Sequence, residues 1–135
     1  MDPAEEHRIL EEALRKAMEE ASTKTANALV LEGKTIKDQE KTVWYAMESV
    51  EFTSFVYNMT HDFDDVDPPT PPTKGMTVAS LVKQATEAVQ QVKFSKGEDR
   101  LADYTRLRDA VHYLRIAYLQ YARKPRRTRQ NLTRS

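Results

Sequence analysis

The sequence predicts an all-α fold of four helices, arranged either as a four-helix bundle or as two helical hairpins joined by a Pro-rich loop. Apolar residues recur at spacings of three and four along most of the 135 residues, which is the repeat of an amphipathic helix. The three glycines, Gly33, Gly75 and Gly97, stand where these periodic segments stop, as expected for residues that end helices. We place a single helical domain at residues 1–124, a length sufficient to bury a core.

The first helix is expected from about residue 3 to residue 32. Asp2 can cap this helix, and Pro3 suits the first helical position. A single apolar stripe follows, made of Ile9, Leu10, Ala13, Leu14, Ala17, Met18 and Ala21. Small polar residues at positions 22–27 interrupt the stripe, so a kink or break there is an open alternative.

The second helix, expected over about residues 35–64 with Thr35 as its N-cap, is apolar on two nearly opposite faces. One face holds Ile36, Val43, Met47 and Val50, and the other holds Tyr45, Phe52, Phe55, Val56, Met59 and Phe63. Such a helix is either central to a bundle or shared with a partner chain. The candidate partner interface is Trp44, Tyr45, Phe52, Phe55, Met59 and Phe63, although core packing is the favoured interpretation of Trp44 and Tyr45 themselves.

A loop that is first acidic and then proline-rich is expected over residues 62–75. Because it is long for a tight connection, the second and third helices need not be neighbours. Its first part, from His61 to Asp67, has carboxylates suited to a hard cation, but the spacing is not that of an EF-hand loop. An acidic loop of this kind is most often simply solvated, and docking on a basic partner is favoured over a metal ion. We predict no metal site.

The third helix is expected over about residues 78–94, capped by Thr77, with a narrow apolar stripe. The fourth is expected over about residues 98–124, because proline at position 125 opposes its continuation. Residues 125–135 contain one apolar side chain, so we expect a disordered, Arg-rich basic C-terminal tail.

Charge is sorted along the chain although its formal total is zero. Residues 1–75 carry eight Lys or Arg and sixteen Asp or Glu, whereas residues 76–135 carry thirteen and five. From Arg100 onward every basic residue except Lys124 is arginine, whose planar fork binds phosphate or carboxylate through two hydrogen bonds. This asymmetry suggests an anionic partner.

The basic residues of the fourth helix form the candidate nucleic-acid or anion site. Its members share one helix face and continue into the tail: Arg108, His112, Arg115, Arg123, Lys124, Arg126, Arg127 and Arg129. Arginine beside exposed aromatic side chains is typical of phosphate contact combined with base stacking. The alternatives are pairing with acids of the first two helices, and binding to an acidic protein or anionic lipid.

Enzyme chemistry finds little support in the sequence. The chain has no cysteine, no glycine-rich phosphate loop and no HExxH motif, and its three histidines, His7, His61 and His112, fall on three different helices. We therefore expect no catalysis, no cofactor and no small-molecule substrate. With no apolar run near the roughly 18 residues that cross a bilayer and no secretory signal, the expected location is intracellular, either cytoplasmic or nuclear if KPRRTR is an import signal.

Two function hypotheses follow. The first is a non-enzymatic, oligomer-forming helical protein that binds nucleic acid through the Arg-rich face and tail. The second is a protein–protein interaction or structural assembly module, in which the acidic and basic surfaces of subunits or of a helical partner meet.

Overall fold

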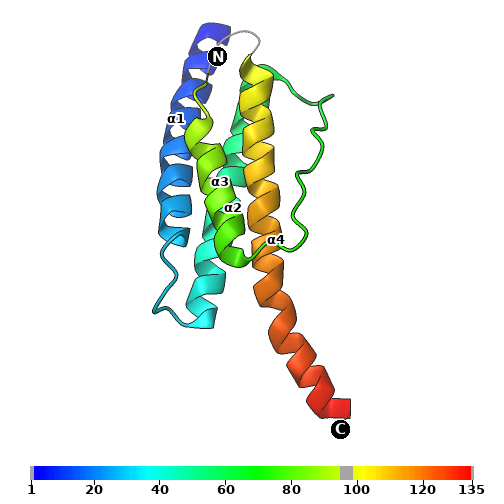
Figure 1. Ribbon diagram of the computed structural model, residues 1–135. Helices are drawn as coiled ribbons and strands as arrows, with labels where there is room; N and C mark the ends of the chain where they lie inside the picture. Colours follow the sequence, from blue (N-terminus) through cyan, green and yellow to red (C-terminus); the bar gives the residue numbers. More distant parts are fainter. Residues whose placement is uncertain (1, 95–98, 135) are drawn as a thin grey trace.

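The computed structural model describes residues 2–94 and 99–134, with side chains described as far as Ala122. It contains four α-helices: α1 (Pro3–Ala28), α2 (Ile36–His61), α3 (Val78–Gln91) and α4 (Asp99–Arg134). The described residues contain no strand. The predicted all-α fold is therefore confirmed, as two helical hairpins packed together into one bundle (Figure 1).

The helices pack in the ring order α1, α2, α4, α3. Helix α2 packs against α1 and α4, while α3 packs against α4 and less extensively against α1. Helices α2 and α3 therefore lie diagonally opposite each other. The long loop between them runs beside α4 from one end of the bundle to the other (Figure 1), which explains how the chain joins two helices that are not neighbours.

The three predicted N-caps are confirmed. The side-chain oxygens of Asp2, Thr35 and Thr77 accept hydrogen bonds from backbone amides in the first turns of α1, α2 and α3. Each cap satisfies an amide that has no partner inside its helix. Two of the three glycines, Gly33 and Gly75, have φ of +84° and +80°, a conformation that favours glycine, whereas Gly97 lies outside the described residues.

Helix α1 is continuous, so the break suggested as an alternative at residues 22–27 is absent. The hydroxyl of Thr25 is buried and donates to the carbonyl of Ala21 at 2.8 Å, which satisfies this polar group within the helix. The helix ends at Ala28 rather than at residue 32. Leu29 is its C-cap, and the turn through Gly33 is closed by a hydrogen bond from the amide of Lys34 to the carbonyl of Leu31.

Helix α2 ends at His61 rather than at residue 64. Asp62 takes a left-handed conformation with φ of 57°. The side chain of Asn58 then holds the turn, accepting from the amide of Phe63 and donating to Asp64. The acids after His61 thus follow the helix end, and only Asp62 occupies the cap position.

The connection between α3 and α4 is tied down by a buried carboxylate. Helix α3 ends at Gln91, earlier than predicted, because Val92 is extended and Phe94 has φ of 51°. Asp103 is fully buried in α4, where it accepts from the amide of Lys93 at 3.3 Å and from Arg106 at 3.0 Å.

Helix α4 continues past Pro125 to Arg134, where the sequence predicts an end at residue 124. Proline removes one backbone hydrogen bond, but the arginine and glutamine residues around it favour helix. In Figure 1 the last part of α4 projects away from the other helices. The tail predicted at residues 125–135 thus has a helical backbone as far as Arg134, and its side chains lie outside the described residues.

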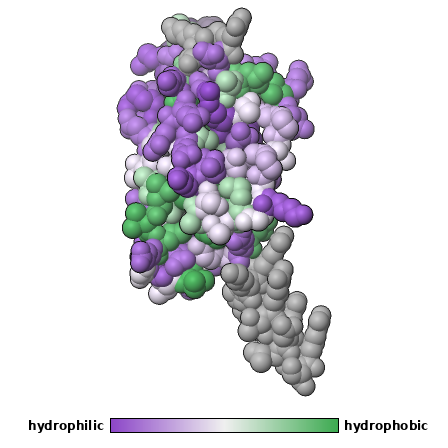
Figure 2. Space-filling model, viewed as in Figure 1, coloured by the Kyte–Doolittle hydropathy of each residue, from purple (hydrophilic) through white to green (hydrophobic). Residues whose placement is uncertain are grey.

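The core combines small side chains with a few large ones, which lets the helices approach closely. The fully buried large residues include Tyr57, Leu81, Leu107 and Leu114, and alanines such as Ala21 and Ala46 lie between them. Thr53 links two helices, because its hydroxyl donates to Ser49 in α2 at 2.8 Å and to Ala17 in α1 at 3.1 Å. On the face drawn in Figure 2, apolar side chains form small patches among hydrophilic ones.

Candidate interaction surfaces

The described part of the predicted basic face lies on α4 and is paired within the chain. Arg108 Nη1 is 3.1 Å from Glu51 Oε2 of α2 and donates to Ser54 Oγ at 3.0 Å. Arg115 approaches the same Glu51 oxygen at 3.9 Å. Two arginines thus converge on one carboxylate, so the alternative of pairing with helix acids holds for both of them.

The proline-rich loop lies against the same residues. Residues 67–71 form a small pocket of about 210 Å³ together with Arg108, Asp109, His112 and Arg115. Burial raises the pKa of the Asp109 carboxyl, and nearby His112 partly opposes this rise. The structure therefore brings together two sites that the sequence suggests separately, the acidic-proline loop and the basic face.

The remaining predicted cations cannot be placed in the same way. Their side chains lie outside the described residues: Arg123, Lys124, Arg126, Arg127 and Arg129. Their backbone belongs to the part of α4 that leaves the bundle in Figure 1. The predicted basic surface thus divides into a part paired inside the bundle and a part beyond it.

The outward face of α2, opposite its buried side, carries four large apolar side chains that are more than half exposed. Their exposed fractions are 53% for Tyr45, 55% for Phe52, 58% for Phe55 and 55% for Met59. With Glu48 these residues follow the alternating spacing of three and four that forms one seam along a helix. Exposed apolar patches of this kind are typical of protein interfaces.

The other two predicted interface residues do not belong to the outward face. Phe63 is partly buried, stacking on Tyr104 with ring centres 4.7 Å apart. Trp44 packs one side on Tyr118, with ring centres 5.0 Å apart, and is 37% exposed. The core interpretation is therefore wrong for Tyr45 and partly right for Trp44. Phe63, which the sequence places with the interface, packs against the core instead.

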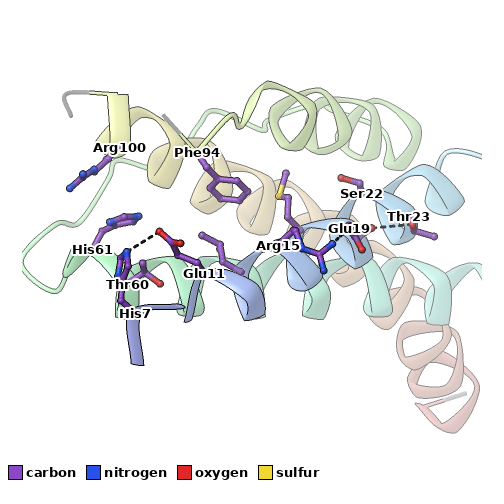
Figure 3. A pocket seen from close by; sticks show the side chains of 12 residues that line it. His7, Glu11, Arg15, Glu19, Ser22, Thr23, Thr60, His61, Phe94 and Arg100 are labelled. Carbon is purple, nitrogen blue, oxygen red and sulfur yellow. Dashed lines mark hydrogen bonds and ion pairs between the residues drawn. The ribbon is translucent and has the colours of Figure 1, made fainter. Parts of the chain in front are cut away.

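A groove that the sequence does not indicate runs along α1 (Figure 3). It has a volume of about 910 Å³, with Leu14, Met18 and Phe94 among its lining residues. His7 and Glu11 pair at 2.8 Å, as their i, i+4 spacing predicts, and Arg15 pairs with Glu19 at 2.6 Å. The acids of the groove are thus already matched by bases of the same helix.

One end of this groove is lined by His7, His61 and Arg100 and lies close to buried polar groups. Burial lowers the pKa of His61, and the charges of Arg100 and His7 lower it further, against a smaller effect of Glu11. Beneath it, burial and the Asp103 carboxylate raise the pKa of Tyr57 to about 12. These contacts join residues from three helices, so no spacing within one helix signals them.

The described residues contain neither a cluster of metal-ligating side chains nor a helix that could cross a membrane. No group of three or more His, Asp or Glu side chains is placed there to hold a metal ion. In the same residues, no helix has both the length and the apolar character needed to cross a bilayer. Comparisons with protein-family models, curated proteins and solved structures give no match to this chain.

Proposed function

We propose that this protein is a non-enzymatic assembly module whose copies associate through the outward face of α2. The observation that carries the proposal is the row of four large apolar side chains, Tyr45, Phe52, Phe55 and Met59, exposed along one helix face. Fully burying one such side chain contributes about 1.5–3 kcal/mol. Aromatic residues at the centre of an interface commonly supply much of its binding energy.

The pairing of the basic residues on α4 favours association through α2 over binding of an anionic partner through α4. Arg108 and Arg115 are partly neutralised by Glu51, and the loop of residues 67–71 lies against them. A polyanion would have to compete with these contacts. On the outward face of α2, by contrast, each of the four apolar side chains keeps more than half of its surface exposed next to the described residues.

Light scattering coupled to size-exclusion chromatography tests the proposal. The wild-type mass should rise with concentration, and Phe52→Glu/Phe55→Glu should stay monomeric. The control Gln84→Glu/Gln90→Glu adds the same two charges at exposed positions of α3 and should associate like the wild type. Circular dichroism should show the same helix content in all three proteins. A wild-type chain that stays monomeric at the highest attainable concentration would refute the proposal.

A second candidate function is nucleic-acid binding through the end of α4. It is favoured by the position of this segment, whose backbone leaves the bundle and the acids of α2 behind (Figure 1). Each phosphate contact on duplex DNA should add about −0.9 to the slope of log affinity against log salt.

A gel-shift titration with a random oligonucleotide tests this second function. The full chain should bind with a steep salt slope, and a chain that ends at Lys124 should bind weakly. The variant Arg108→Gln/Arg115→Gln serves as the control, because these cations are already paired with Glu51. Equal binding by the full and shortened chains would exclude the tail as the site.

A further inference from the structure

The outward face of α2 has opposite charges at its two ends. Three exposed lysines, Lys34, Lys37 and Lys41, lie just before and within the first turns of the helix. The exposed acids Asp62 and Asp64 follow its other end. The four apolar side chains of the outward face lie between these two charged ends.

The neighbouring helix α1 strengthens this gradient. Its N-terminus lies beside the C-terminal end of α2, since His7 and His61 line the same groove. The exposed first-turn acids Glu5 and Glu6 are therefore at the acidic end. At the other end, the Lys24 ammonium lies 5.7 Å from the ring centre of Tyr45. The two ends thus differ in their excess of charge, although Glu32 and Asp38 are exposed acids at the basic end and Arg8 is an exposed base at the acidic end.

This arrangement decides how two copies can meet. Packing two α2 helices in parallel would set lysines against lysines and acids against acids. Packing them antiparallel sets each basic end against an acidic end, twice in the same pair. Charge matching of this type selects orientation and excludes the wrong alignment, and the alternating spacing of the apolar residues supplies the seam between them.

We infer that the occupant of the outward face is the same face of a second copy, with the two α2 helices antiparallel about a two-fold axis. The inference rests on the proposed function and specifies its partner surface. Because each copy uses the same patch, the contact closes at two subunits and does not propagate. An open head-to-tail chain through α4 is disfavoured, since Arg108 and Arg115 already pair with Glu51.

The lack of cysteine in the sequence makes disulfide cross-linking a direct test. Tyr45→Cys and Met59→Cys are prepared as separate single-cysteine proteins, oxidised alone and as an equal mixture. In the antiparallel pair, position 45 of one copy lies near position 59 of the other. Two copies of position 45 are then about 21 Å apart along the helices, far beyond the roughly 4.4–6.8 Å between Cα atoms that a disulfide requires.

The inference expects a covalent dimer in the mixture at least tenfold more abundant than in either protein alone. Phe52→Cys, near the middle of the face, should cross-link by itself, and the exposed α3 control Gln90→Cys should not. Cross-linking of Tyr45→Cys alone would indicate parallel helices and overturn the inference. Assemblies larger than a dimer in light scattering would also overturn it while leaving the proposed function intact, whereas a monomeric wild type would refute both.

A charge-reversal series gives an independent readout. Lys37→Glu/Lys41→Glu should weaken association about tenfold or more. Asp64→Lys/Asp65→Lys, which also reverses the exposed neighbour Asp65, should do the same, and the combination of both sets in one chain should restore association. The control Lys83→Glu/Glu87→Lys exchanges charges on exposed positions of α3 and should change nothing. Failure of the combined variant to recover, with the single sets impaired, would show that the two ends do not meet.

Discussion

The two faces of α2 share one spacing but have opposite environments. Val43, Val50 and Tyr57 recur at every seventh residue and are fully buried. Tyr45, Phe52 and Met59 repeat at the same interval, two positions further along, and are mostly exposed. Apolar periodicity therefore defines faces of a helix without showing which face meets a neighbour.

Side-chain size differs between the two faces, with Tyr57 as the large exception on the inward one. The inward face includes Ala46, Thr53 and Ser54, whose small side chains let α1 and α4 approach α2 closely. The outward face carries bulkier aromatic residues that the bundle leaves exposed. A face of small residues suits close packing inside the chain, and a face of large aromatic residues suits an interface.

The largest expected effect separates the inward face from the outward face directly. Tyr57→Ala should lower the free energy of unfolding by about 3–5 kcal/mol, because it leaves a cavity among the rings of His61, Phe63 and Phe94. Phe55→Ala, on the same helix, should lower it by less than about 1 kcal/mol. Urea denaturation of dilute, monomeric protein measures both, and equal losses would show that the outward face is also packed in the monomer.

A gain in association should follow from completing the outward seam. Glu48 is exposed and occupies the one polar position between Tyr45 and Phe52. Glu48→Leu should tighten self-association about tenfold. Burying the leucine side chain contributes up to about 3 kcal/mol, and the contact no longer has to bury the Glu48 carboxylate. Sedimentation equilibrium measures the change. Unchanged or weaker association would place residue 48 outside the contact.

The elements of the fold were more predictable than their ends or their contacts. The caps at Thr35 and Thr77 depend on residues three positions apart, so the sequence shows them. The end of α2 depends on how the Asn58 side chain meets Phe63 and Asp64 after the chain turns. That geometry has no repeating pattern, which is why the predicted end at residue 64 was too late.

In the candidate site, too, features that depend on local spacing were predictable, and features that depend on contacts between helices were not. The outward aromatic residues were found because helical periodicity groups them. The convergence of Arg108 and Arg115 on Glu51 was predicted only as a general alternative, since the paired residues Arg108 and Glu51 are 57 positions apart. Likewise, Asp103 and the groove along α1 depend on contacts between helices, which charge patterns along the chain do not specify.

The buried hydroxyl of Tyr57 gives a smaller effect on the inward face. It has no hydrogen-bond partner among the described residues, and burial together with the Asp103 charge raises its pKa to about 12. Tyr57→Phe keeps the ring and should raise the free energy of unfolding by about 1 kcal/mol. Urea denaturation at neutral pH measures this change. A loss of stability would instead show that the hydroxyl is bonded in solution.

The ion pair between α2 and α4 should contribute less still. Glu51→Gln should lower the free energy of unfolding by only about 0.5 kcal/mol, because Glu51 and both arginines are partly exposed. The same change should increase binding of inorganic phosphate or an oligonucleotide to the freed Arg108 and Arg115. Thermal unfolding and a gel shift measure the two effects, and unchanged anion binding would show that the proline-rich loop alone limits access.

The smallest expected effect concerns His61, the last residue of the inward face. Its pKa is lowered in the folded protein, mainly by burial and then by the charges of Arg100 and His7, so the unfolded chain takes up a proton at higher pH than the folded one. The stability that depends on neutral His61 is therefore fully present above about pH 6.5 and is lost as pH falls through the lower folded pKa. His61→Gln should remove this part of the loss, so the drop in free energy of unfolding between about pH 7.5 and pH 5.5 should be smaller in the variant. Urea denaturation measures the drop. Identical drops in wild type and variant would mean that His61 has the same pKa in the folded and the unfolded chain, and so is not buried by the inward face.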